Sequence, residues 1–336
     1  MAEELADQPK GTAEGMGSAE YAFTDEQDQL RNAVAAFCAD HIDEGAVRAQ
    51  MESDPPFDAK VWVRLGAELG VLGMSVPESA GGVGGTLIDQ AVAVEQLGAA
   101  LACGPLFGTV YLAIPALVAA SPSAQTAELL TSLMEGSRTA AFAVTDTAGA
   151  FDPTTVAVEA AGGHPDWTLS GTVQRVVDAG AADELLVAAN SPDGVALFAV
   201  DTDAIGVRRT PLATLDLTRP QATVELRDAP ARLGAGADEA ERVISHALHV
   251  GTALLAVEQV GAASHLLDLT VQYAKDRLQF GRPIGSFQAV KHRLADDLVA
   301  LEHAKSTAYH AVWALTDGSD DPALAVSIAA ATCTAA

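Results

Sequence analysis

Five basic side chains gather in one short stretch of a chain that is otherwise strongly acidic. The 336 residues include 19 Lys and Arg against 45 Asp and Glu, which gives a formal net charge of −26. The members of the cluster, which only Asp276 opposes, are Lys275, Arg277, Arg282, Lys291 and Arg293. Grouped cations can meet the charge of a phosphate, and arginine offers a fixed fork for two of its oxygens. The cluster indicates an anion site, or alternatively a solvated helix end with cations near its C-terminus.

The string that runs through the cations, RLQFGRPIGSFQ at 277–288, favours the ligand site. It contains the glycines and the proline of a turn, yet it also carries Phe280, Ile284 and Phe287. An ordinary surface link would be polar. Rings set between cations suit a ligand with a flat ring and a pyrophosphate, or a partner subunit that covers both.

Long helices are expected on both sides of this string. Residues 240–278 have helical composition without proline, and residues 287–315 place apolar side chains at steps of three, four or seven. A third helix is expected from Asp321 as cap with Pro322 as its first residue. Because the chain stops within apolar periodicity, we expect a helical bundle over 234–336 that is apparently incomplete.

The rest of the chain divides into a helical part and a strand-rich part. Residues 1–20 read as a flexible tail, and the helical pattern of 21–135 opens with a capping box formed by Thr24 and Gln27. Short β-branched runs separated by turn residues fill 136–233, and without intervening helices they predict an antiparallel barrel or sandwich. The expected fold class is therefore α+β and multidomain, with an N-terminal α-helical domain, a middle β domain and a C-terminal helical bundle.

Composition excludes several classes of function. The net charge opposes nucleic-acid binding, because a polyanion would be repelled. The uncharged stretch 97–120 is long enough for a membrane span, but glycines and prolines break it, so no span is expected. The acidic, polar start gives no export signal, and three distant cysteines without CxxC spacing predict reduced thiols. A cytoplasmic protein is expected.

Three other patterns carry less chemistry. His246, His249 and His265 lack a carboxylate that would complete a metal site, so no metal is expected. The glycine loop PESAGGVGG at 77–85 misses the third glycine of a dinucleotide fingerprint and reads as a plain turn. VEQLGAA at 94–100 recurs as VEQVGAA, which begins at Val257, but one echo at so long a period does not make a repeat architecture.

Three segments resemble the acyl-CoA dehydrogenase family, and the resemblance covers about 21–336. They are YAKDRLQFGRPIGSFQAVKHRLADD at 273–297, FTDEQDQLRNAV at 23–34 and PESAGGVGG at 77–85. The resemblance implies FAD held between barrel and bundle, with two subunits completing each flavin site. It implies that Arg277 reaches the pyrophosphate of a neighbouring subunit's FAD. The other residues that it implies at the flavin are Gln279, Phe280, Gly281 and Gln288 from the same string, and Phe142, Val144 and Thr145 from a strand and turn of the barrel.

The resemblance also implies a reaction, the α,β-desaturation of an acyl-CoA thioester with electrons passed on to an electron-transfer flavoprotein. A glutamate takes the α proton while a hydride leaves for FAD. Most members carry that glutamate in a late segment, which would lie beyond Ala336, and a minority carry it at the place of Gly251. Glu258, two turns further along the same face, is a candidate base, and Asp268 is a weaker one. The alternative for Glu258 is a helix carboxylate paired to a neighbouring cation.

The sequence departs from the family at the flavin contacts. Phe151 stands where a serine is expected, and Arg175 and Val177 stand for the usual tryptophan and threonine. Two functions follow. The chain is a self-sufficient FAD-dependent dehydrogenase, a dimer or tetramer, or it is a non-catalytic subunit that completes the FAD site of a catalytic paralogue in a hetero-oligomer. The second arrangement is that of some members acting on bulky substrates such as steroid side chains rather than fatty acids; a truncated chain is a third possibility.

Overall fold

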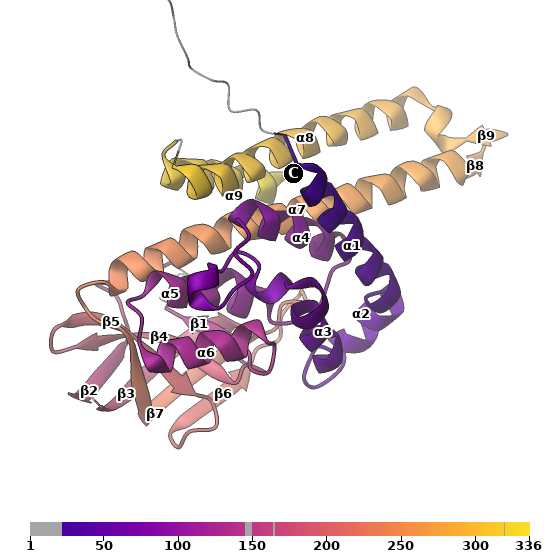
Figure 1. The fold of residues 1–336 in the computed structure, drawn as a ribbon. Coiled ribbons are helices and arrows are strands. Elements are labelled where there is room, and N and C mark those ends of the chain that lie inside the picture. The colour runs from indigo at the N-terminus through magenta and orange to yellow at the C-terminus, as the bar shows by residue number, and fades with distance from the viewer. Residues whose placement is uncertain (1–21, 145–149, 164, 319) are drawn as a thin grey trace, which may run out of the picture.

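The computed structural model describes residues 22–144, 150–163, 165–318 and 320–336. A group of N-terminal helices packs beside a β domain, and a long helical hairpin crosses both and projects beyond them (Figure 1). This order of helical, strand-rich and helical parts confirms the expected fold class. The predicted flavin contact Thr145 lies outside the described residues.

The N-terminal part consists of short helices joined by tight turns. Its α-helices are α1 (Asp25–His41), α2 (Glu44–Met51), α3 (Ala59–Leu69), α4 (Leu87–Ala99), α5 (Ile114–Ala119) and α6 (Ala124–Met134). The 3-10 turns η1 (Val71–Gly73) and η2 (Glu78–Ala80) follow α3, and the π-helix η3 (Leu106–Ala113) precedes α5. The predicted capping box of Thr24 and Gln27 is confirmed at the start of α1. The glycine loop at 77–85 forms turns that lead into α4, with no strand before it.

The β domain is a closed barrel. Its strands are β1 (Ala140–Ala143), β2 (Val158–Gly163), β3 (Asp166–Val177), β4 (Glu184–Ser191), β5 (Gly194–Asp201), β6 (Val207–Pro211) and β7 (Gln221–Ala235). Pairing runs β4–β2–β3–β7–β5 and returns to β4, which closes the ring. Leu169, Phe198 and Val224 are among the side chains that fill its interior. Closure leaves few unpaired strand edges.

Strand direction departs from expectation at one point of the barrel. Most pairs are antiparallel, as the sequence predicts, whereas β1 runs parallel to β4 and β2 touches β4 in parallel through Glu159 and Asn190. The chain reaches β4 only after the β2–β3 hairpin, so no tight turn forces β1 and β4 to be antiparallel. Within the strand-rich part, the run TTVAVEA at 154–160 becomes a strand only from Val158.

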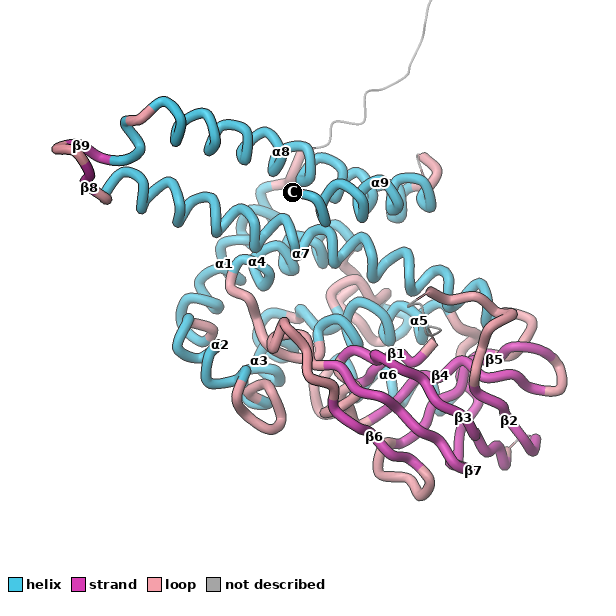
Figure 2. The backbone as a smooth tube through the Cα atoms, turned by 180° about the vertical axis from the view of Figure 1, so that it is seen from behind, coloured by secondary structure: helices cyan, strands magenta, loops and turns pink. Residues whose placement is uncertain are grey.

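The C-terminal part is built on α7 (Ala240–Asp276), α8 (Gln288–Asp317) and α9 (Pro322–Ala335). The predicted cap at Asp321 is confirmed, since its carboxylate accepts hydrogen bonds from the first turn of α9. The turn between α7 and α8 holds β8 (Leu278–Gln279), β9 (Arg282–Pro283) and the 3-10 turn η4 (Ile284–Ser286). This tip lies at the end of the hairpin that points away from the barrel (Figure 2).

The two halves of α7 have different surroundings. Its buried side chains run from Ala240 to Gly261, and beyond that point only Ala274 is buried. Among the described helices, α7 alone has the length and composition of a membrane span, and 56% of its apolar window is buried inside the protein. Helices at the core of globular proteins share these properties. The stretch 97–120 is divided among the end of α4, η3 and α5.

Candidate functional site

The hairpin tip exposes the predicted flavin-binding residues. Phe280 and Gly281 adopt positive φ angles of 53° and 75°, which close the turn between β8 and β9. The Phe280 ring is 92% exposed and meets Phe287 edge-on, with 6.2 Å between the ring centroids. The Arg282 guanidinium lies 4.1 Å from the centroid of Phe287. Arg277 is exposed, and its guanidinium forms no hydrogen bond or ion pair with the described residues.

A hollow of about 450 Å³ lies beside the tip. Its lining residues come from the end of α7, the turn and the start of α8: Val271, Ala274, Lys275, Pro283, Gly285, Ser286, Lys291 and Leu294. Gly285 is required there, because a methyl group at this position would lie 2.9 Å from the Ala274 carbonyl oxygen. The tip therefore combines exposed cations, an exposed ring and a concave apolar surface of the size of small-molecule sites.

The predicted flavin contacts of the barrel lie apart from the tip. Phe142 and Val144, at the end of β1, are only 6% and 5% exposed. Figures 1 and 2 both show β1 beneath the buried half of α7, whereas β8 and β9 lie at the opposite end of the hairpin. The structure thus does not bring the two predicted halves of a flavin site together within one chain.

The three departures from the family also face different environments. Phe151 packs against the main hydrophobic core, and its phenyl ring lacks the hydroxyl that a serine would offer for a hydrogen bond. Arg175 is exposed at a bulge of β3 with φ 56°, and Val177 pairs with Gln221 at the end of that strand. The tip residues fit a bound FAD, whereas these barrel positions supply no hydroxyl or stacking ring for one.

The position of Gly251 has no room for a carboxylate. A methyl group added there would lie 2.4 Å from Leu112 Cδ2 and 3.2 Å from the Tyr111 carbonyl oxygen. Both neighbours belong to η3, which packs directly on α7. The side chain of Leu112 thus occupies the space that a base at this position would need.

Glu258, the candidate base, is already engaged on both carboxylate oxygens. Oε2 accepts a hydrogen bond of 2.7 Å from the Tyr111 hydroxyl, and Oε1 forms an ion pair with Arg219. Only 14% of the Glu258 side chain and 16% of the Arg219 side chain are exposed. This is the arrangement expected for a helix carboxylate paired with a cation. Burial, together with Glu258, holds the pKa of Tyr111 well above its usual range, so the phenol remains a donor.

Asp178 lies in the same region, and nothing in the sequence singled it out. Its Oδ2 accepts a hydrogen bond of 2.9 Å from the Gly108 amide of η3. Burial raises the pKa of Asp178 to about 6, against the opposing effect of Arg219. We call Tyr111, Asp178, Arg219 and Glu258 the junction cluster, because η3, the barrel and α7 meet at these side chains.

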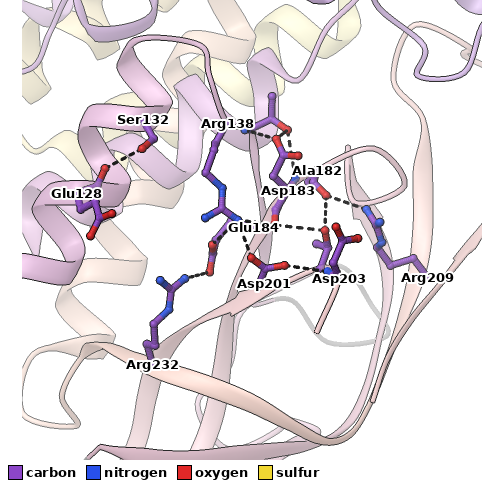
Figure 3. Close-up of polar contacts among 12 residues, drawn as sticks. Glu128, Ser132, Arg138, Ala182, Asp183, Glu184, Asp201, Asp203, Arg209 and Arg232 are labelled. Atoms are coloured by element: carbon purple, nitrogen blue, oxygen red, sulfur yellow. Dashed lines mark hydrogen bonds and ion pairs between the residues drawn. The ribbon is translucent and has the colours of Figure 1, made fainter. Parts of the chain in front are cut away.

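A second polar cluster holds the wall of the barrel (Figure 3). Glu184 is fully buried, and its Oε1 accepts a hydrogen bond from the Arg232 guanidinium. The Arg138 guanidinium lies 3.1 Å from Glu184 Oε2. Arg138 also donates to Asp201 at 3.0 Å. Burial raises the pKa of Glu184, and Arg232 opposes that effect. These contacts join the start of β1 to β4, β5 and β7.

Comparison with known proteins agrees with this architecture. The family model of the acyl-CoA dehydrogenase N-terminal domain matches residues 24–137, and that of the C-terminal domain matches residues 241–336. The Mycobacterium tuberculosis acyl-CoA dehydrogenase IpdE2 is 35% identical over 294 residues, which is 87% of this chain and 77% of the relative.

Two solved structures resemble the chain closely. One is a variant of the Tcur3481-Tcur3483 steroid ACAD, with a TM-score of 0.80 and 31% identity over 91% of this chain and 82% of the other. The other is the ChsE4-ChsE5 complex from Mycobacterium tuberculosis, with a TM-score of 0.81 and 30% identity over 93% and 83%. The chain belongs to the acyl-CoA dehydrogenase family of FAD-dependent oxidoreductases.

Proposed function

We propose that this chain acts in the α,β-desaturation of an acyl-CoA thioester as a non-catalytic subunit that completes the FAD site of a catalytic paralogue in a hetero-oligomer. The observation that carries the proposal is the exposed hairpin tip. The Arg277 guanidinium finds no hydrogen-bond or ion-pair partner among the described residues of its own chain, Phe280 is 92% exposed, and the tip projects away from its own barrel.

The tip has the chemistry to hold a dinucleotide that another subunit binds. A bound FAD supplies the acceptor for the hydride that leaves the substrate. The Arg277 fork can meet two pyrophosphate oxygens, and the exposed Phe280 ring can cover an aromatic part. Gln279, Gly281 and Gln288 lie on the same turn and at the start of α8, where they shape this surface.

The interior supports a non-catalytic role. Position 251 is closed by Leu112, and the Glu258 carboxylate is held by Arg219 and Tyr111. Proton abstraction by Glu258 would require the breaking of a largely buried ion pair, which is strongly unfavourable. In our proposal the carboxylate that takes the α proton belongs to the paralogue.

The similar structures support the assembly and suggest a substrate class. One is described as a complex of two different chains, and the other as a two-protein steroid ACAD. By this likeness the substrate is a bulky acyl-CoA such as a steroid side-chain thioester. An electron-transfer flavoprotein would then reoxidise the flavin.

Co-expression tests the proposal. The chain is purified alone and after co-expression with a homologue from the same organism, and visible spectra are recorded before and after addition of acyl-CoA. We expect flavin colour only in the pair, with bleaching by substrate. Flavin that binds and bleaches in the lone chain would instead establish a self-sufficient dehydrogenase.

Two variants of the pair sharpen the test. Arg277→Ala should weaken flavin binding by about ten- to a hundred-fold, because it removes a charge-assisted contact. Arg208→Ala, which removes a similarly exposed arginine from the barrel, is the control and should bind flavin normally. Glu258→Gln should leave the bleaching of whatever flavin remains bound intact; retained flavin with lost bleaching would identify Glu258 as the base.

A further inference from the structure

The two copies of the echoed sequence pack against each other. We call residues 94–100 of α4 and residues 257–263 of α7 the paired motif. A methyl group added at Gly98 would lie 2.2 Å from the Glu258 carbonyl oxygen, and one added at Gly261 would lie 1.9 Å from the Glu95 carbonyl oxygen. At each glycine, the missing side chain therefore lets the backbone carbonyl of the other copy's glutamate pack directly against the helix. The contact has local two-fold symmetry, and the helices run in opposite directions there.

The symmetry extends to the glutamate side chains. Glu95 accepts a hydrogen bond from the Tyr309 hydroxyl and one of 2.9 Å from Lys305 Nζ. Glu258 accepts a hydrogen bond from the Tyr111 hydroxyl and pairs with Arg219. Each carboxylate thus binds one phenol and one cation. Burial raises the pKa of Tyr309 as it raises that of Tyr111, so both phenols donate.

The two glutamates fasten different parts of the molecule to one crossing. Lys305 and Tyr309 lie one turn apart on α8, the second arm of the hairpin. Tyr111 belongs to η3, and Arg219 precedes β7 of the barrel. The crossing of α4 and α7 is therefore the place where the hairpin and the barrel are anchored to the same pair of helices.

We propose that the paired motif is a joint that fixes the direction in which the hairpin leaves the body, and that its glycines and glutamates are positioning residues for the tip. From Gly261 to Asp276, α7 runs a further 15 residues, about 22 Å at the rise of an α-helix. A small tilt at the joint is enlarged over that length. The purpose of the joint, the presentation of Arg277 to a partner's FAD, rests on the proposed function, whereas its geometry does not.

The first experiment measures the hairpin direction without any flavin. Spin labels are placed at Gln279→Cys on the tip and Asp193→Cys on the barrel, in a Cys103→Ser background, and the distribution of label distances is recorded. Gly98→Ala and Gly261→Ala should each shift or broaden that distribution, because the added methyl group forces the helices apart. Gly45→Ala is the helical control, since only an exposed Asp43 oxygen lies within 4 Å of its methyl position.

A second pair of variants tests the glutamates. Glu95→Gln keeps the size and the acceptor for Tyr309 but leaves the Lys305 charge unmatched, so it should also broaden the distribution. Adding Lys305→Met removes the unmatched charge, and the double variant should regain the narrow wild-type distribution. A motif that only contributes stability would lower the thermal midpoint and leave the label distance of the folded protein unchanged, and that result would overturn the proposal.

Flavin binding by the unlabelled pair separates the two proposals. If the joint serves the flavin site, the glycine variants should weaken flavin binding by about tenfold or more, as expected from the loss of one well-placed contact, while the Gly45→Ala pair binds normally. A shifted distance with unchanged flavin binding would uphold the joint and contradict the role of the tip in the proposed function.

Discussion

Buried carboxylates mark the places where the parts of this chain join. Glu95, Glu184 and Glu258 each pair with a lysine or an arginine. Asp178 differs, because it accepts its hydrogen bond from the backbone amide of Gly108, and burial still raises its pKa to about 6. The cation beside a paired carboxylate offsets part of the free-energy cost of burying the charge. For Asp178 that cost is offset less completely.

Replacement of Asp178 by asparagine should stabilise the protein at neutral pH. The folded-state pKa is raised from 3.8 to about 6, so the unfolded chain ionises first and wild-type stability falls as the pH rises between these values. Asp178→Asn keeps an acceptor for Gly108 and removes that loss, which amounts to about 3 kcal/mol above the folded pKa.

Urea unfolding at several pH values measures the effect. The gain in the free energy of unfolding should be small near pH 4 and full near about pH 7. Asp193→Asn, which changes an exposed carboxylate for which no such gain is expected, is the control. A gain that does not depend on pH would show that the Asp178 charge is not its cause.

The sequence singles out the residues of the tip and Glu258, but not Tyr111, Asp178 and Arg219 of the junction cluster. Arg277, Phe280 and Gln288 were recognised because they lie within one short string. Arg219 and Glu258 are 39 residues apart, and Asp178 binds an amide 70 residues away. Isolated charges along a sequence carry no sign of such pairing, which only the packing of η3 and the barrel on α7 creates.

At the scale of elements, the sequence predicts the starts of helices correctly, but it does not predict which distant strands pair or in which direction. Caps at Thr24 and Asp321 mark helix starts through contacts within one turn, so the sequence suffices to place them. The direction of β1 against β4 depends on how the chain returns after the β2–β3 hairpin. Closure of the barrel also depends on a distant contact, the parallel pairing of β2 with β4 through Glu159 and Asn190.

The glycines of the loop before α4 allow its backbone to pack closely within the turn, and one substitution tests this. A methyl group at Gly82 would lie 2.2 Å from the Val76 carbonyl oxygen. We therefore expect Gly82→Ala to lower the free energy of unfolding by about 1–3 kcal/mol, as overpacking does. Gly180→Ala, whose methyl position has no neighbour within 4 Å, is the control. Equal stability of the two variants in urea would contradict a packing role.

The whole molecule carries its charge unevenly. Against a net charge of −26, residues 275–293, which form the tip and the adjoining helix ends, carry five cations and one acid. The field of the body therefore repels other anions, while the tip remains a local attractor. This separation leaves the tip as the part of the surface suited to an anionic ligand.

Added salt should stabilise the isolated chain. Screening shortens the Debye length from about 30 Å at 0.01 M to about 8 Å at 0.15 M and so weakens the repulsion among excess acidic side chains. We expect the thermal midpoint, followed by tryptophan fluorescence, to rise over this range. Sodium and potassium chloride should act alike at equal ionic strength. A falling midpoint would show that attractive ion pairs outweigh the repulsion.

If the chain assembles as proposed above, the continuity of α7 links that assembly to folding. The first half of this unbroken helix, Ala240–Asp276, packs in the hydrophobic core, and its second half extends from the body to the tip. A subunit whose body has not folded cannot hold its outer half in place, so it has no ordered surface to offer. In the hetero-oligomer proposed above, a partner subunit that binds this surface would therefore exclude copies whose body has not folded.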